Sequence, residues 1–303
     1  MATTAVKLLK ENYMSISNQD KASVLVEALP YIQKYTGKTV VIKYGGNAML
    51  SEELQDAVMS DIVLLSLTGI HVVLVHGGGP DINEMLAKVG KKSQFINGLR
   101  YTDEETAEIA LMVLAGKTNK QLVDKIQRKG GRAIGLCGLD GGLLKAKKYT
   151  DAEGTDYGFV GEVESVNAEV INDVISKGYI PVISTIAHSD DGTGVYNINA
   201  DTAAAEIAIA LQASNFILLT DTRGVLRNPP DEESLIPSIK TSEFEDLKKE
   251  GIISGGMIPK VKCCVDAANA GIHHTFITDG RIKHSILIEM LSEKGCGTMF
   301  VNK

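Results

Sequence analysis

Two glycine-rich turns, each directly after a predicted strand, could hold an anion. Residues 72–83 read Val-Val-Leu-Val-His-Gly-Gly-Gly-Pro-Asp-Ile-Asn, a buried-type strand that runs into three glycines and the start of a helix. Glycines let backbone amides approach an anion closely, and the helix start adds the positive end of its dipole. A second turn, residues 43–47, follows an earlier strand and contributes Lys43, a point charge suited to phosphate. Because the carboxyl ends of parallel strands meet at one edge of a sheet, the two turns together predict a phosphate cradle, although either alone could be an unliganded loop.

Three further stretches could bring polar side chains to the same edge. They are residues 197–204, residues 220–226 and residues 254–260. Taken singly, each is typical of a turn or a helix cap. Together they add an acid, Asp201, and a second lysine, Lys260, to the predicted cradle.

Two well-known nucleotide motifs do not fit the sequence. A Gly-x-Gly-x-x-Gly pattern that begins at Gly77 would need a glycine at position 82, which is Ile82. The pattern Gly-x-x-x-x-Gly-Lys-[Ser/Thr] does not occur anywhere. The chain is therefore neither an obvious Rossmann dehydrogenase nor a P-loop enzyme.

The bulk composition favours a small-molecule partner. With 303 residues and 44% hydrophobic content, the chain can bury one large α/β domain or two lobes. The formal net charge of −7, without a basic run, argues against nucleic-acid binding.

The four cysteines lack zinc or disulfide spacing, so we expect them to be reduced. No apolar run approaches the ~20 residues of a membrane span, and we expect a cytoplasmic protein.

Alternating strand and helix patterns position the turns. Short β-branched runs separated mostly by helical stretches predict a three-layer αβα sandwich around a mainly parallel sheet. A β-hairpin lid is predicted over residues 143–149 and 157–165, and the spacing of Thr102 and Glu105 fits a capping box. The predicted sheet strands are residues 40–42, 72–75, 133–137, 180–183, 216–219 and 274–277.

The chain divides into an N-terminal helical arm (residues 1–37), a lobe with the hairpin (38–213) and a second lobe (214–303), where a new strand, turn and helix series begins. The arm contains an apolar stripe that includes Tyr13 and a second helical pattern over residues 18–35, which Pro30 could bend. The first helix either folds back on its own domain or grips another subunit.

Five motifs, taken in order, resemble those of the amino-acid kinase family. They are Val41-Ile42-Lys43-Tyr44-Gly45-Gly46, His76-Gly77-Gly78-Gly79-Pro80, Asn97-Gly98-Leu99-Arg100-Tyr101-Thr102, Asn197-Ile198-Asn199-Ala200-Asp201 and Gly255-Gly256-Met257-Ile258-Pro259-Lys260. Each is weak alone, but the ordered set is specific and covers about residues 38–303. It is most similar to the branch of the family that phosphorylates N-acetyl-L-glutamate. The resemblance implies the amino-acid kinase fold and transfer of a phosphoryl group from ATP to the side-chain carboxylate, giving N-acetyl-L-glutamyl 5-phosphate in arginine biosynthesis.

The resemblance also implies roles for individual residues. Lys43 and Lys260 would stabilise charge on the transferring phosphoryl group, and Asp201 would position both lysines. Arg100 would pair with the α-carboxylate of the acceptor. The acceptor, bound on the lobe 38–213, would also meet Gly78, Gly79, Asn197 and Asn199. ATP would lie mainly on the lobe 214–303, and its implied contacts are Gly45, Gly46, Thr220, Asp221, Gly224, Val225, Leu226, Gly255, Gly256 and Met257. Mg²⁺ would be held by the ATP phosphates and by no protein side chain.

The chemistry of this reaction agrees with these roles. A glutamate side chain has a reference pKa near ~4.3, so the nucleophile is ionised at neutral pH without a general base. The reaction instead needs positioning and compensation of negative charge, which lysines, glycine amides and Mg²⁺ can supply. We therefore expect His76 to have a structural role.

The arm suggests regulation. Family members with such an extension form ring-shaped hexamers, trimers of dimers, that arginine inhibits. The C-terminal stretch is similar to the effector loop of that group, with Glu289 as the partner of the effector's cationic end and Tyr13 as a cover. The implied effector residues are Tyr13, His284, Glu289, Gly295 and Gly297. A PII-type signalling protein is a further partner that the resemblance leaves open.

Two alternatives remain at this point. Within the fold, the chain could be another kinase that acts on aspartate, glutamate or carbamate, and Arg100 is the feature that discriminates among them. From another class, it could be a non-catalytic arginine-sensing module, which the presence of Lys43, Lys260 and Asp201 disfavours.

Overall fold

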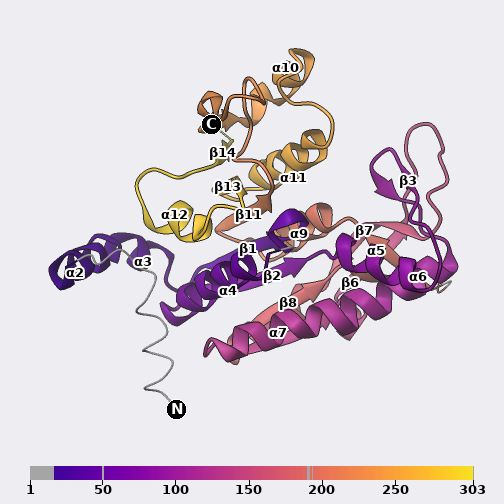
Figure 1. Cartoon of the computed structure of the whole chain (residues 1–303), viewed down its shortest axis with the longest axis horizontal. Helices are drawn as coiled ribbons and strands as arrows, with labels where there is room; N and C mark the ends of the chain where they lie inside the picture. Colours follow the sequence, from indigo (N-terminus) through magenta and orange to yellow (C-terminus); the bar gives the residue numbers. More distant parts are fainter. Residues whose placement is uncertain (1–16, 50, 190–191, 193, 303) are drawn as a thin grey trace.

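The computed structural model describes residues 17–49, 51–189, 192 and 194–302. The predicted first helix of the arm, with Tyr13, lies outside these ranges. Figure 1 shows the first half of the chain, in indigo to magenta, on one side of the molecule and the last third, in orange to yellow, on the other. Within the described ranges, none of the helices is long and apolar enough to span a bilayer.

One eight-stranded sheet runs through the molecule in the order β12-β14-β13-β11-β1-β2-β8-β5. Its pairs are parallel except for β13 with β14. All six predicted strands belong to it, so the predicted mainly parallel sheet is confirmed. The strands are β1 (Thr39–Tyr44), β2 (His71–His76), β5 (Ala133–Cys137), β8 (Ile180–Ser184), β11 (Asn215–Thr220), β12 (Ser238–Lys240), β13 (His274–Asp279) and β14 (Thr298–Val301).

Helices cover both faces of this sheet, as the three-layer prediction requires. Alternate residues of a strand point to opposite faces. Thus Val40 and Ile42 of β1 belong to one buried cluster, and Val41 belongs to another. The first cluster includes residues of α4 (Glu52–Leu67), α7 (Asn119–Arg128) and α12 (Ser285–Leu291). The second includes residues of α8 (Ala168–Ser176), α9 (Ala200–Ala210), α10 (Phe244–Lys249) and α11 (Met257–Asn269).

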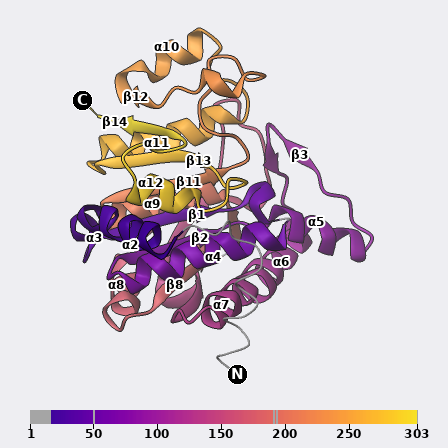
Figure 2. The same cartoon turned by 60° about the vertical axis from the view of Figure 1, so that its left-hand side comes forward.

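A third group of helices stands beside the glycine turn. It comprises α5 (Gly79–Lys88), α6 (Glu104–Leu111) and the π-helix η2 (Met112–Thr118), which continues directly into α7. Figure 2 shows α5 and α6 on the same side of the molecule as β3. Short 3₁₀ turns occur at η1 (Gly46–Met49), η3 (Asp140–Gly142), η4 (Glu232–Ser234) and η5 (Thr241–Glu243).

The predicted hairpin is present, and it is part of a larger unit. β6 (Leu144–Lys148) and β7 (Val160–Val166) pair antiparallel. They close into a four-stranded barrel with β9 (Ile186–Ser189) and β10 (Val195–Ile198).

A second, smaller hairpin extends outward at the right of both views (Figures 1 and 2). It joins β3 (Phe95–Ile96) to β4 (Leu99–Arg100) through Asn97 and Gly98, which have φ values of 48° and 82°. Two left-handed residues in a two-residue loop match the twist of a hairpin, and Asn-Gly adopts this conformation readily.

The helical part of the arm is divided at Ala28. α2 (Asn18–Glu27) is capped by Ser17, and α3 (Leu29–Tyr35) has Pro30 in its first turn. No residue of α2 is buried, and apolar side chains such as Leu25 are exposed.

Two local predictions are wrong. Thr102 does not cap a helix; Asp103 caps α6 by accepting from Thr106 N–H, and Thr102 instead donates to Arg100 O at 2.9 Å. Lys43 does not follow its strand but lies within β1, in register with Val75 and Leu218. Local spacing could not show that the chain at Thr102 bridges to Gly158 across the structure.

Candidate functional site

Asp201 lies between two lysines from different parts of the chain. Its Oδ1 forms an ion pair with Lys43 Nζ at 2.8 Å, outside hydrogen-bond geometry, and its Oδ2 accepts from Lys260 Nζ at 2.6 Å. β1 holds Lys43, the first turn of α9 holds Asp201, and the first turn of α11 holds Lys260. The structure therefore brings together all three residues predicted to be catalytic.

The charges of Lys43, Asp201 and Lys260 stabilise one another at a place that solvent reaches only in part. Lys43 and Asp201 are both buried, whereas Lys260 is partly exposed. Burial raises the pKa of Asp201, but Lys43 and then Lys260 overcome that effect and lower it to about 2. The cluster contains two ammonium groups and one carboxylate, so its net charge is positive and suits an anion that arrives between the lysines.

The glycine turns lie beside Lys43, and at two of their glycines a side chain would have little room. A Cβ at Gly45 would lie 2.9 Å from Lys43 Nζ, and a Cβ at Gly78 would lie 2.5 Å from Leu114 Cδ2. Gly78 is also the residue that precedes α5, so the amides of this turn lie at the positive end of the helix dipole. The backbone can thus approach a ligand at both turns.

These groups surround a cavity of about 260 Å³. Its walls include Lys43, Asp201 and the predicted acceptor residues, together with Gly45 and Gly46 of the turn that follows β1. Lys260 and the predicted ATP contacts of the lobe 214–303 do not line it. The lining residues that were predicted are Lys43, Gly45, Gly46, Gly78, Gly79, Arg100, Asn197, Asn199 and Asp201.

Arg100 is buried at the base of the small hairpin and is held without a carboxylate partner among the described residues. One guanidinium nitrogen donates to Ser93 Oγ at 2.9 Å and another to Gly79 O at 3.2 Å, while the guanidinium lies 4.8 Å from the ring centre of Phe95. Burial lowers the pKa of Arg100. A buried guanidinium on the wall of a cavity is suited to a ligand carboxylate.

The two predicted asparagines have different surroundings. Asn197 lies in β10 and lines the cavity. Asn199 also lines it, but its Oδ1 caps α9 by accepting from Asp201 N–H and Thr202 N–H. Its oxygen is therefore engaged in holding Asp201 in place.

The predicted ATP contacts within residues 214–303 form two groups, one at the C-terminal end of β11 and one at the start of α11. Thr220 ends β11, and Asp221 follows it. Gly224 and Val225 pack against β14, where Val225 N–H donates to Thr298 Oγ1 at 2.9 Å; Leu226 bridges to Leu235. The second group, Gly255, Gly256 and Met257, forms the start of α11, and a Cβ on either glycine would meet no atom within 4 Å.

Three of the predicted effector residues lie together near the C-terminus. Glu289 Oε1 accepts from Cys296 N–H at 2.8 Å, and a Cβ on Gly295 or Gly297 would fall within about 3 Å of the Glu289 carboxylate. His284 makes a different contact, a hydrogen bond between its Nδ1 and Asp61 Oδ1 of α4 at 2.6 Å. The fifth predicted residue, Tyr13, lies outside the described ranges.

His76 is fully buried beneath the glycine turn. Its Nδ1 lies 2.8 Å from Gly77 O, and its Nε2 lies 3.1 Å from Asn119 Nδ2. Burial, partly opposed by the bond to Gly77, lowers the pKa of His76 to about 4. Its ring is thus not exposed to substrate, in agreement with the structural role expected for it.

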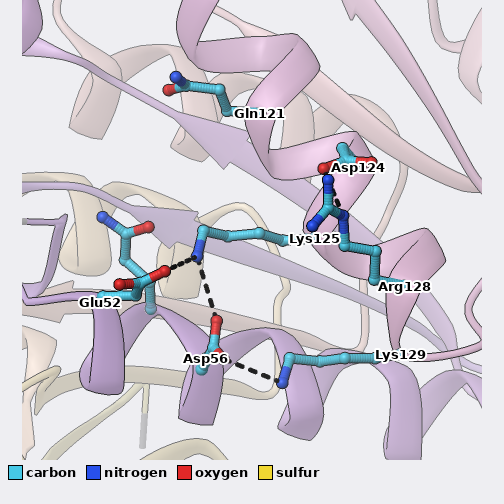
Figure 3. A pocket seen from close by; sticks show the side chains of 8 residues that line it. Glu52, Asp56, Gln121, Asp124, Lys125, Arg128 and Lys129 are labelled. Carbon is cyan, nitrogen blue, oxygen red and sulfur yellow. Dashed lines mark hydrogen bonds and ion pairs between the residues drawn. The ribbon is translucent and has the colours of Figure 1, made fainter.

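A larger groove of about 620 Å³ between α4 and α7 is a poorer candidate site. Figure 3 shows Lys125 reaching Glu52 and Asp56, and Lys129 also reaching Asp56. Its charges are thus paired with one another, and none of the predicted site residues lines it. The smaller cavity is lined by Lys43 and Asp201 of the cluster and by Arg100, which has no carboxylate partner in the part of the chain that the structure describes, so we assign the site there.

Sequence reasoning missed several residues that line the smaller cavity. Thr185 follows β8 at the same edge of the sheet, so the strand-end rule could have found it. Leu114 lies in the π-helix, and Phe95 lies in the small hairpin. No local sequence signal indicates that these two side chains reach the site.

The four cysteines are free, as expected. Within the described ranges, no three His, Cys, Asp or Glu side chains form a group that could hold a metal ion.

Comparisons with known proteins found a matching family profile, close relatives and a similar solved structure. The profile of the amino acid kinase family matches residues 38–279. An acetylglutamate kinase of Brachyspira hyodysenteriae is 56% identical over 286 residues, which are 94% of this chain and 98% of that protein. One of Clostridium beijerinckii is 53% identical over 284 residues, 94% of this chain and 99% of that protein. Among solved structures, an N-acetylglutamate synthase of Neisseria gonorrhoeae, complexed with coenzyme A and N-acetyl-glutamate, is similar with a TM-score of 0.81 and 26% identity. The match covers 93% of this chain and 63% of the synthase, so this chain spans less than two thirds of that protein.

Proposed function

The chain belongs to the amino acid kinase family, and we propose that it transfers the γ-phosphoryl group of ATP to the side-chain carboxylate of N-acetyl-L-glutamate in arginine biosynthesis. The observation that carries this proposal is the Lys43–Asp201–Lys260 cluster beside a glycine-lined cavity that also contains Arg100. Two relatives that share more than half of their residues with this chain are named acetylglutamate kinases, which supports this acceptor.

The mechanism needs no proton acceptor. The acceptor carboxylate is ionised at neutral pH, because its reference pKa is near ~4.3. The difficulty is that it must approach an anionic phosphoryl group. Lys43 and Lys260 lie on two sides of Asp201 and would neutralise charge on the transferring group, while the Gly78 turn would donate backbone N–H groups. Asp201 would hold the two ammonium groups at the required separation before ATP binds.

The acceptor would be oriented by its other carboxylate. Arg100 would receive the α-carboxylate, and Asn197 would face the remaining polar groups. Because Gly79 O and Ser93 already fix the guanidinium, little freedom is lost on binding.

ATP would extend from the glycine turns to the proposed ATP-binding lobe, residues 214–303. The open start of α11 and the end of β11 are the surfaces offered to it. The two lysines and the side-chain-free turns fit a phosphate chain. Mg²⁺, held by the phosphates, would supply further charge neutralisation.

We also propose that arginine inhibits the enzyme and that the arm, residues 1–37, joins subunits into a cytoplasmic hexamer. The exposed apolar side chains of α2 support this, because such a surface is costly in water. The gathering of Glu289 with Gly295 and Gly297 supports a carboxylate-based effector site near His284.

A coupled assay for ADP release tests the proposal. We expect turnover with N-acetyl-L-glutamate, much less with L-glutamate, and inhibition by added arginine. Lys260→Ala should lower turnover at least about a hundredfold, the loss expected when one charge-stabilising group is removed. Lys262→Ala is the matched control, because Lys262 lies on the same helix and pairs with Asp266 at the surface. Absence of ADP release from the unaltered protein with N-acetyl-L-glutamate would refute the proposed acceptor.

A further inference from the structure

His76 lies at the point where β2 ends and the glycine turn begins, and its hydrogen bonds define which ring nitrogen bears the proton. Asn119 Nδ2 also lies 2.8 Å from Val182 O and 3.2 Å from Leu136 O. Two carbonyl oxygens around one amide atom identify that atom as the NH₂ group. The NH₂ group offers no acceptor to an N–H at Nε2, so the proton of the neutral ring is on Nδ1.

That proton is directed at the backbone of the turn. Nδ1–H donates to Gly77 O at 2.8 Å, the acceptor being the carbonyl of the residue that follows the histidine. Burial keeps the ring neutral, since the pKa of His76 is lowered to about 4. A protonated ring would direct Nε2–H at the Asn119 NH₂ group, which is a donor too.

The bond to Gly77 O also sets the direction of the next amide. In a planar trans peptide, the C=O of one residue and the N–H of the next point in opposite directions. With Gly77 O turned toward the imidazole, Gly78 N–H is turned away from it. The neighbouring groups are engaged, because Gly77 N–H donates to Tyr44 O and Gly78 O accepts from Ile82 N–H. Among the residues that the structure describes, no acceptor is bonded to Gly78 N–H, and Gly78 lines the cavity.

The π-helix holds the other side of the turn. Leu114 packs where a Gly78 side chain would be, and Thr118 Oγ1 donates to Asp81 Oδ2 at 2.8 Å in the first turn of α5. Asn119, the next residue, holds His76. The continuous helix formed by η2 and α7 thus contacts the turn through Leu114 and Thr118 and the imidazole through Asn119. π-Helical segments are often found at functional sites.

We propose that His76 is a positioning residue for phosphoryl transfer: through Nδ1–H it fixes the Gly77–Gly78 peptide so that Gly78 N–H points at the reacting groups. Asn119 fixes the imidazole in the required tautomer. This inference rests on the proposed function, since it assigns a role within the same site. Gly78 N–H would act on charge that develops during transfer, so its orientation matters more to kcat than to binding of either substrate.

Two amide replacements separate this role from simple packing. In His76→Asn, the amide nitrogen can occupy the place of Nδ1 and donate to Gly77 O. In His76→Gln, the longer amide reaches the place of Nε2 and cannot make that bond in the same way. We expect His76→Gln to lower kcat at least about tenfold, the effect of one misdirected hydrogen bond, with KM values changed less, and His76→Asn to retain a clearly higher kcat. If His76 only fills space, the order reverses, because glutamine is closer to histidine in volume.

The control is His71, at the exposed start of the same strand. His71→Asn and His71→Gln should leave kcat unchanged. Melting temperatures of all four variants separate loss of fold from loss of rate. A His76→Gln variant with kcat equal to or above that of His76→Asn would overturn the proposal.

A measurement on the unaltered protein covers the case in which neither His76 variant folds. With ¹⁵N-labelled histidine, assigned through the backbone to Gly77, His76 should be neutral at pH 7 with its proton on Nδ1. A proton on Nε2 would overturn the inference. The spectrum does not depend on the acceptor, so an unaltered protein that is inactive with N-acetyl-L-glutamate would refute the proposed function, and the spectrum would still decide this inference.

Discussion

Asp201 is the residue whose replacement tests the site most directly. Asp201→Asn keeps the size and shape of the side chain but removes the charge that both lysines share. The two oxygens of a carboxylate can each face one ammonium group. In asparagine only the Oδ1 atom can accept, because Nδ2 is a donor. The two lysines would then repel each other, and their ammonium groups would move apart before ATP arrives.

The expected loss of stability follows from the pKa of Asp201. A decrease of this pKa from its usual value of 3.8 to about 2 corresponds to roughly 2 kcal/mol of stability at pH 7. Because the folded-state pKa is below that of the unfolded chain, this contribution is present above about pH 4 and is lost as the pH falls toward 2. Asp201→Asn should therefore lower the free energy of unfolding by roughly 2 kcal/mol at pH 7, with a difference that decreases below about pH 4.

The expected kinetic effect is larger and falls on one parameter. A displacement of about 1 Å in a positioning group can cost about a hundredfold in rate, so we expect kcat to fall at least that much. The KM for ATP should not rise, because the lysines retain their charge and lose their intramolecular partner. Urea unfolding at several pH values and the ADP-release assay measure the two effects.

Asp266→Asn is the matched control, because Asp266 pairs with Lys262 on the exposed side of α11. It should change stability by less than about 1 kcal/mol and leave kcat unaltered. An Asp201→Asn enzyme with kcat within about twofold of the unaltered protein would refute the reasoning, as would equal effects of the two substitutions.

Three further predictions concern other parts of the site. Arg100→Lys should raise the KM for N-acetyl-L-glutamate at least about tenfold, since a planar bidentate donor is lost, and leave the KM for ATP unchanged; an unchanged acceptor KM in the steady-state assay would contradict the assignment. Gly78→Ala places a Cβ 2.5 Å from Leu114 Cδ2 and should lower kcat/KM about tenfold, whereas the double variant with Leu114→Ala should recover part of it; no loss in the single variant would mean that the turn is not clamped. Deletion of residues 1–17 should give a catalytically competent dimer with weaker arginine inhibition, and light scattering that still reports a hexamer, with equal sensitivity, would exclude the proposed role of the arm.

The sheet and the lysine cluster could be predicted because both follow from rules about strand ends. Buried parallel strands need apolar runs, and ligand groups collect at the carboxyl ends of such strands. Lys43, Asp201 and Lys260 each lie at or next to such an end or at a helix start, so their meeting could be expected despite their separation in the chain.

Other features depend on contacts that no local pattern encodes. The edge strand β12 and its neighbour β14 are only three and four residues long, too short for a periodic signal. Leu114 lines the cavity from a π-helix, a geometry that no local pattern of the sequence indicates. Thr102 has the spacing of a cap but is held in a bridge to Gly158, so a tertiary contact overrides its local preference.

The single continuous sheet limits how the two proposed lobes can move relative to each other. β1, from residues 38–213, pairs with β11, from residues 214–303, along Val40 to Lys43. A hinge that opened between these strands would expose buried backbone groups, each at about 1–3 kcal/mol. Relative motion must therefore occur as a change of twist across the sheet, and the sheet resists such a change elastically.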